Sequence, residues 1–144
     1  MCRNTFRIRR SRSVFCKEKW KIIKKPVHYT TKEILDRVKE FVDKGAKYIV
    51  LRTTEFYSIP KLLEIVKEIR KEIPGTYEII FNTGELDMTI SNLMVESGVS
   101  GVYHACRIRE GIDTPFDPWD RKNTMSNVHR SGLKLISLVE PIGI

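Results

Sequence analysis

Residues 45–55 read Gly-Ala-Lys-Tyr-Ile-Val-Leu-Arg-Thr-Thr-Glu, and this stretch carries the pattern that decides the fold. A glycine ends a helical segment, a short apolar run follows, and polar residues close the unit. The pattern returns three more times before Ile144, around the apolar runs 77–81, 102–103 and 133–139. Strands that return only after an intervening helix lie parallel, and near-continuous apolar strands are those covered on both faces. The repeats predict an α/β protein with a parallel sheet.

Two parallel architectures fit these repeats, an open doubly wound sheet and a closed (β/α)8 barrel. The polar residues after the first apolar run contain no glycine-rich dinucleotide loop. Four strands, or five if the N-terminal segment adds one, amount to half of a typical barrel of about 250 residues. We expect a partial TIM-type barrel of (β/α) repeats over residues 29–144. Since such a sheet has an unpaired edge, a second chain completing the barrel is an expected partner.

The basic residues are concentrated in a tail over residues 1–28. The net charge is +8, but residues 1–25 hold ten Lys or Arg against one acid, which leaves sixteen against seventeen for the other 119 residues. The tail lacks a groove-reading motif and has few aromatic residues, so we expect no specific nucleic-acid partner. No apolar run is long enough to span a membrane. Three cysteines without close spacing indicate a reducing, cytoplasmic location.

Capping residues predict where the helices begin. Thr30 and Glu33 have the spacing of a capping box, and Asp117 precedes a proline that suits the first turn of a helix. Another helix is predicted from about Leu86 to Ser97. The side chains expected to face inward on the first and third helices are Ile34, Val38, Phe41 and Val42, and then Ile90, Leu93 and Met94.

Polar residues follow each predicted strand, at the edge where parallel α/β sheets carry their chemistry. If the third strand continues, Arg107 and Arg109 share one side and face a ligand. Thr83 is either a ligand contact or the cap of the next helix. His104 is either directed into the barrel mouth or a hydrogen-bonded core residue. Cys106 is expected to be a small buried hydrophobe, and Arg121 is either a ligand contact or a solvated residue beside Asp117 and Asp120.

The segment 104–118, Arg121, and the segments 131–134 and 139–143, taken as a set, resemble the middle of the barrel in biotin-synthase-like radical S-adenosylmethionine enzymes. Methylornithine synthase and the radical enzyme associated with iron-guanylylpyridinol cofactor assembly are the nearest groups. The resemblance covers roughly residues 29–144. It implies cleavage of S-adenosylmethionine at a [4Fe–4S] cluster, in the biosynthesis of a cofactor or an unusual amino acid from a small-molecule substrate.

The resemblance also implies roles for individual residues. Arg121 matches the arginine that binds the S-adenosylmethionine carboxylate, a role suited to the fork of a guanidinium group. Glu55 stands where the family receives the ligand's amino group, although Thr53 and Thr54 replace the usual glycines. The remaining implied contacts are Thr83, Arg107 and Glu110 for S-adenosylmethionine, and Glu85, Arg109 and Glu140 for the substrate.

The cluster motif is where the sequence departs from the family. The family uses three cysteines, in the pattern Cys-x3-Cys-x-aromatic-Cys or a longer-spaced variant. Cys16 and Phe15 match the third cysteine and the aromatic residue, but Ser13 and Arg9 (Arg7 in the variant) occupy the other ligand positions. Neither side chain replaces a thiolate. We therefore expect no competent cluster on this chain alone.

Three explanations for this departure stay open: a degenerate N-terminal segment, a fragment of a longer or split protein, and a barrel that has become a binding module. The competing hypothesis for function is accordingly a non-enzymatic half-barrel that binds a small ligand or a protein.

Overall fold

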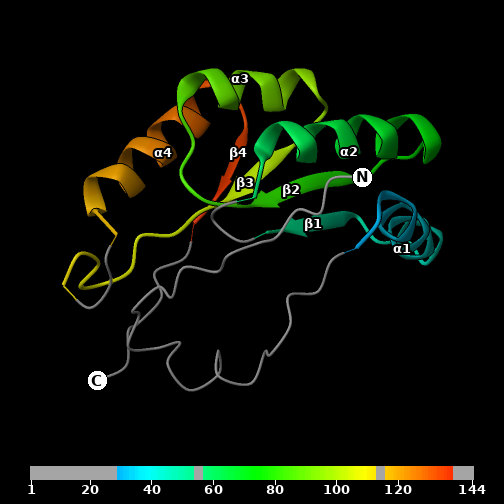
Figure 1. Ribbon diagram of the computed structural model, residues 1–144, viewed down its shortest axis with the longest axis horizontal. Coiled ribbons are helices and arrows are strands. Elements are labelled where there is room, and N and C mark those ends of the chain that lie inside the picture. The colour runs from blue at the N-terminus through cyan, green and yellow to red at the C-terminus, as the bar shows by residue number, and fades with distance from the viewer. Residues whose placement is uncertain (1–28, 54–56, 113–115, 138–144) are drawn as a thin grey trace, which may run out of the picture.

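The computed structural model describes residues 29–53, 57–112 and 116–137, and these form alternating helices and strands (Figure 1). The elements are α1 (Thr31–Asp43), β1 (Tyr48–Arg52), α2 (Ile59–Glu72), β2 (Glu78–Asn82), α3 (Met88–Glu96), β3 (Gly101–Tyr103), α4 (Pro118–Arg130) and β4 (Lys134–Ile136). The predicted α/β class and the four predicted repeats are confirmed. The predicted site residues Glu55 and Glu140, the cluster candidate Cys16 and the whole basic tail lie outside the described residues.

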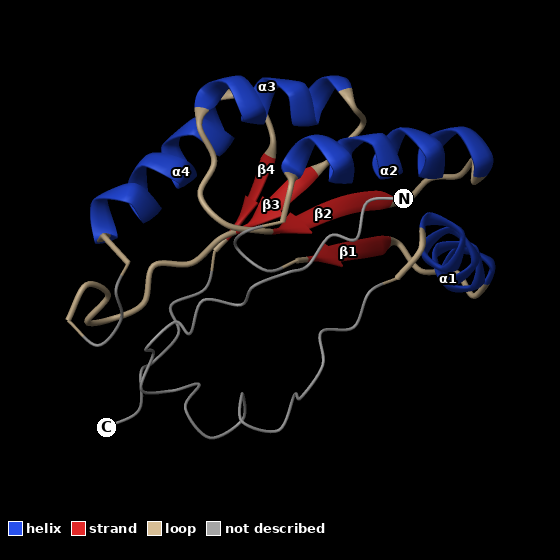
Figure 2. Cartoon of the chain, viewed as in Figure 1, coloured by secondary structure: helices blue, strands red, loops and turns tan. Residues whose placement is uncertain are grey.

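The four strands form one parallel sheet in the order β1-β2-β3-β4 (Figure 2). This order decides between the two predicted architectures. A doubly wound sheet reverses its strand order at a switch point, whereas a barrel adds each new strand beside the last one. The described residues form part of a (β/α) barrel, as the sequence predicts.

Helices α2, α3 and α4 cover one face of this sheet, and α1 lies beside the end at which β1 begins (Figure 1). Alternate strand residues point into the helix layer and are buried there, among them Ile79, Phe81 and Val102, which are fully buried. The residues between them point to the opposite face. On that face Tyr48 and Val50 of β1 are 60% and 56% exposed.

Helix α2 contributes more buried residues to the core than any other described helix. Its apolar stripe, Leu62, Ile65, Val66 and Ile69, is buried, as is its C-cap Ile73. Burial of a side chain of this size contributes about 1.5–3 kcal/mol.

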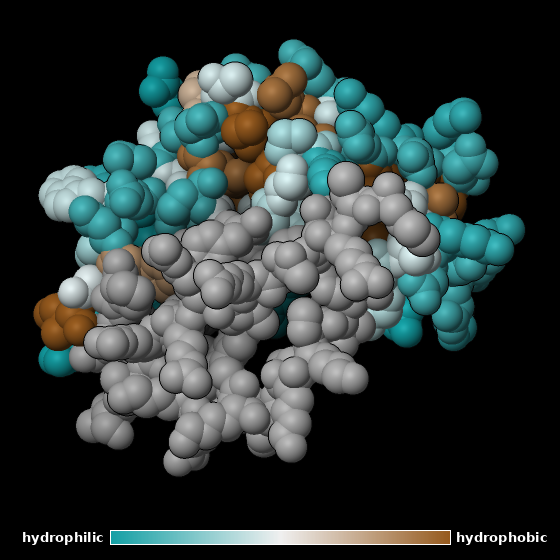
Figure 3. Space-filling view, in the orientation of Figure 1, coloured by the Kyte–Doolittle hydropathy of each residue, from teal (hydrophilic) through white to brown (hydrophobic). Residues whose placement is uncertain are grey.

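Two residues predicted to face inward do not. Phe41 on α1 is 50% exposed and Leu93 on α3 is 40% exposed, because each lies at the margin of its helix's apolar stripe rather than at its centre. Hydrophobic residues are visible around α3 in the space-filling view (Figure 3). None of the described helices is both long and apolar enough to cross a membrane.

Helices α1, α3 and α4 begin at side chains that cap them, whereas Ser58, expected to cap α2, makes no capping hydrogen bond. The Thr30–Glu33 capping box is present, and Asp117 accepts a hydrogen bond from the Trp119 amide. The third helix begins at Met88, not Leu86, since the Asp87 side chain accepts from the Ile90 amide at 2.7 Å. Thr83 therefore does not cap this helix, and residues 83–87 form a loop at the carboxyl end of β2.

Arg70, in the last turn of α2, bonds to the backbone at the amino ends of the strands, opposite the ends at which β2 and β3 lead into the loops. Its guanidinium donates to the carbonyl of Gly98 through Nε and Nη2, at 3.0 and 2.8 Å, and to the carbonyl of Tyr77 through Nη1 at 3.0 Å. It also lies over the Tyr77 ring. These contacts join α2 to the segments that lead into β2 and β3.

Candidate functional site

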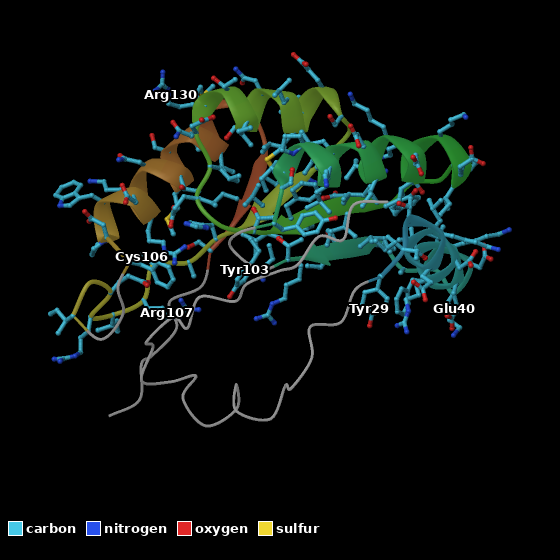
Figure 4. All side chains as sticks on the ribbon, in the orientation of Figure 1. Tyr29, Glu40, Tyr103, Cys106, Arg107 and Arg130 are labelled. Atoms are coloured by element: carbon cyan, nitrogen blue, oxygen red, sulfur yellow. The ribbon has the colours of Figure 1, made fainter. Side chains whose placement is uncertain are left out.

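Polar side chains from three separate segments meet at the carboxyl edge of the sheet. They come from the β2–α3 loop, from the chain that leaves β3, and from the first half of α4. Figure 4 shows Cys106 and Arg107 where the chain leaves β3 near α4, at the far end of the molecule from Tyr29 and Glu40. We call the group of Glu85, His104, Glu110, Arg121 and Thr124 the rim cluster.

Glu85 occupies the centre of the rim cluster. Its Oε1 lies 2.8 Å from Arg121 Nη1, and its Oε2 accepts a hydrogen bond from the Thr124 hydroxyl at 2.5 Å. His104 Nε2 lies 3.4 Å from the same Oε2, the distance of an ion pair when the imidazole is protonated rather than of a short hydrogen bond. The Glu85 side chain is bonded by Arg121 and Thr124 of α4, yet it remains 33% exposed to solvent.

The contacts around Glu85 favour its ionised form. Partial burial raises the pKa of its carboxyl group, but the contacts with His104, Thr124 and Arg121 outweigh that effect and leave the pKa below the ordinary value of 4.5. Glu85 is therefore a carboxylate at neutral pH.

Arg121 is buried, which excludes the interpretation as a solvated surface residue: its side chain is only 9% exposed. Its guanidinium stacks 4.4 Å from the centroid of the Phe116 ring, and Nε lies 3.9 Å from Glu110 Oε1. That Nε makes no hydrogen bond within the described part of the chain. Arg121 thus lies between two carboxyl groups and against an aromatic ring.

The segment after β3 does not continue as a strand, so the predicted alternation of Arg107 and Arg109 is wrong. The chain turns instead: the Glu110 amide donates to the Arg107 carbonyl, and Arg109 has a positive φ of 65°. The turn directs Glu110 inward, where its side chain is 0% exposed and its Oε2 accepts from the Arg107 amide at 2.9 Å. Arg107 therefore meets the rim cluster through its backbone.

The remaining candidates stand as follows. His104 is 3% exposed and contacts Glu85, so it belongs to the site and not only to the core. Thr83 Oγ1 is buried and has no hydrogen-bond partner among the residues that the structure describes. Cys106 is only partly buried, which corrects its prediction as a buried hydrophobe. Within residues 29–53, 57–112 and 116–137, no three His, Cys, Asp or Glu are grouped to hold a metal ion.

Two residues were not predicted from the sequence: Thr124 of the rim cluster, and Asn127, which bonds the neighbouring Leu86 carbonyl. Both lie on the face of α4 that carries Arg121, at intervals of three residues. The sequence signal that could have identified them is the recurrence of polar residues every three positions after Arg121. It carries little weight alone, because polar residues on a helix are usually solvated.

Comparisons with known proteins address the fold alone. No family model matches the chain, and no curated protein matches it significantly. Among solved structures, a muconate cycloisomerase variant matches with a TM-score of 0.53 at 10% sequence identity. The match covers 75% of this chain but 29% of that chain, whose fold is of the TIM type. The likeness agrees with a partial α/β barrel.

Proposed function

We propose that this chain is the ligand-binding part of a (β/α) barrel related to biotin-synthase-like radical S-adenosylmethionine enzymes. Its rim cluster would bind S-adenosylmethionine or a similar small molecule with an amino group. One observation carries the proposal: Glu85 is an oriented, partly exposed carboxylate at the carboxyl edge of a parallel sheet. Ligand sites of such sheets lie at this edge.

Glu85 would accept hydrogen bonds from the ligand. A carboxylate with a lowered pKa is fully charged at neutral pH and bonds ammonium or hydroxyl donors strongly. The ammonium group and the ribose hydroxyls of S-adenosylmethionine are donors of this kind.

Arg121 would bind the ligand carboxylate, as the resemblance implies. Its Nη1 lies 2.8 Å from Glu85 Oε1, whereas its Nε makes no hydrogen bond to the described residues. A bidentate carboxylate would therefore share the guanidinium with Glu85. Because the arginine is buried against Phe116, its charge is poorly screened by solvent, which strengthens its attraction for an anion.

The sequence of this chain lacks the three-cysteine motif that holds a [4Fe–4S] cluster. Cys106 is the one cysteine among the described residues, and its Sγ lies 4.0 Å from the Arg107 carbonyl. Such a cluster needs three thiolates and leaves the fourth iron for the ligand. The proposed function of the chain by itself is therefore binding, and radical generation would require cysteines from a separate polypeptide segment.

Calorimetry with S-adenosylmethionine on the full chain tests the proposal. Glu85→Gln keeps the shape of the side chain and removes its charge. Loss of one charge-assisted hydrogen bond costs about 1.5–3 kcal/mol, so affinity should fall about tenfold or more. The matched control is Asn123→Ala, an exposed position on the outer face of α4. Absence of binding by the wild-type chain, or equal affinity in Glu85→Gln, would refute the proposal.

A second candidate function, a half-barrel that binds a protein, rests on a different observation. The sheet face opposite the helices exposes Tyr48, Val50 and Ile136, the last by 40%. In a closed barrel the corresponding face is packed with side chains from all strands. We propose that a second chain covers this face and pairs with the sheet edges at β1 and β4, in the simplest case a second copy of the same chain.

A further inference from the structure

Leu86, in the loop after β2, is held by α4 at both of its backbone polar groups. Its amide donates to the Thr124 hydroxyl at 3.0 Å, and its carbonyl accepts from Asn127 Nδ2 at 3.1 Å. Its side chain is 3% exposed. The helix thus binds this loop in the way that a neighbouring strand would, through one donor and one acceptor.

Thr124 makes two bonds with one buried oxygen. The residue is 1% exposed, and its hydroxyl accepts from the Leu86 amide while it donates to Glu85 Oε2. The Leu86 amide donates to the Thr124 oxygen, so the single hydroxyl proton is left to point at the Glu85 carboxylate. The loop backbone thus fixes the direction in which the hydroxyl donates. The loop and the acidic side chain that it carries are therefore set by the same atom.

We propose that Thr124 is the positioning residue of the rim cluster: its hydroxyl sets the orientation of the Glu85 carboxylate relative to the carboxyl edge of the sheet. A free glutamate side chain samples many rotamers, and ordering it costs free energy that a ligand would otherwise have to supply. The threonine orders it before a ligand arrives. The use of that orientation in binding rests on the proposed function, whereas the orientation itself does not.

Asn127 provides a matched contrast. It bonds the same residue, Leu86, from the same face of α4, but makes no hydrogen bond to Glu85 in the described structure. A purely structural role for Thr124 predicts that Thr124 and Asn127 variants behave alike. A positioning role predicts that only loss of the Thr124 hydroxyl changes the titration of the Glu85 carboxylate.

The experiment follows the titration of Glu85 by the carbon-13 shift of its carboxyl group in the full chain. The charged and titratable groups around that carboxyl group are His104 from the end of β3, Arg121 from α4, and Glu110 beyond Arg121. These stay constant across the variants. Thr124→Val removes the hydroxyl at constant shape, Thr124→Ser keeps it, and Asn127→Ala removes only the bond to the Leu86 carbonyl.

We expect the Glu85 midpoint to rise in Thr124→Val, to return to the wild-type value in Thr124→Ser, and to stay unchanged in Asn127→Ala. The same midpoint in Thr124→Val and wild type overturns the proposal. If Thr124→Val does not fold, the wild-type chain supplies the decision: the Thr124 Cβ shift should move with the Glu85 midpoint, and a shift that does not move overturns the proposal. Since these titrations contain no ligand, failure of the chain to bind S-adenosylmethionine would overturn the proposed function alone.

Discussion

Arg121 Nη1 lies 2.8 Å from Glu85 Oε1, and this ion pair joins α4 to the loop that follows β2. The pair is asymmetric, because the arginine side chain is 9% exposed and the glutamate side chain 33%. The buried partner also faces Glu110, whose side chain is fully buried. Arg121 thus lies close to the carboxylates of both Glu85 and Glu110, and its removal should affect both.

Replacement of Arg121 by methionine should destabilise the fold. Methionine keeps the length of the side chain, but Glu85 and Glu110 would both lose the buried cation that lies between them. Breaking a buried pair from one side costs about 3 kcal/mol. The free energy of unfolding from urea titrations measures this loss. The control, Arg130→Met, changes an exposed arginine on the same helix and should stay within about 0.5 kcal/mol of wild type. Equal losses in both variants would contradict the buried role of Arg121.

Acid should weaken the fold through Glu85. Its folded-state pKa lies below the ordinary value of 4.5, so it stabilises the protein above pH 4.5 and loses that contribution as the pH falls through the lower folded value. The Glu85→Gln variant should lack this part of the acid dependence between pH 5 and that folded pKa. Unfolding free energies measured across that range test the expectation. Glu64→Gln, an exposed position on α2, should retain the wild-type slope, and a slope in Glu85→Gln as steep as in wild type would count against the prediction.

Sequence reasoning recovers the sheet because its signals are local. The apolar stripe of α2, the glycine that ends α1, and the caps Thr30 and Asp117 each involve residues within a few positions of one another. The repeat predicts that the strands are parallel, whereas their order β1-β2-β3-β4 comes from the structure. The errors at Phe41 and Leu93 lie at the edges of helical stripes, where the packing of the neighbouring element decides exposure.

The site is predicted only in part, because its contacts are long-range. The rule for carboxyl edges brings Glu85 and Glu110 into one region, and the family resemblance adds Arg121, which lies close to both in the structure. The rule does not give their pairing, which depends on the turn at Arg109 and on the rotation of α4 about its axis. Thr124 and Asn127 could not be selected in advance, since their partners are the backbone and side chain of a loop nearly forty residues earlier.

Arg70 should contribute to stability and not to ligand binding. It bonds the Gly98 and Tyr77 carbonyls at the edge of the sheet opposite the rim cluster, where barrel residues serve the fold. Lysine cannot reproduce the planar fork, so Arg70→Lys should lose about 2 kcal/mol of unfolding free energy. Its affinity for S-adenosylmethionine in calorimetry should equal that of wild type. Lys71→Arg, at the exposed neighbouring position, is the control and should change neither quantity. Loss of affinity for S-adenosylmethionine in Arg70→Lys but not in Lys71→Arg would contradict the prediction that Arg70 serves stability alone.

Val50→Lys should prevent a second copy of the chain from covering the open face of the sheet. Val50 is 56% exposed on that face, and burial of a valine contributes at least about 1.5 kcal/mol. Placing an ammonium group there should therefore raise the dimer dissociation constant about tenfold or more. Sedimentation equilibrium measures that constant. The control is Phe41→Lys, which places the same charge at a 50% exposed apolar residue on α1 and should leave association unchanged. A wild-type chain that stays monomeric, or a Val50→Lys chain that associates as wild type does, would rule out the second copy as the partner on this face.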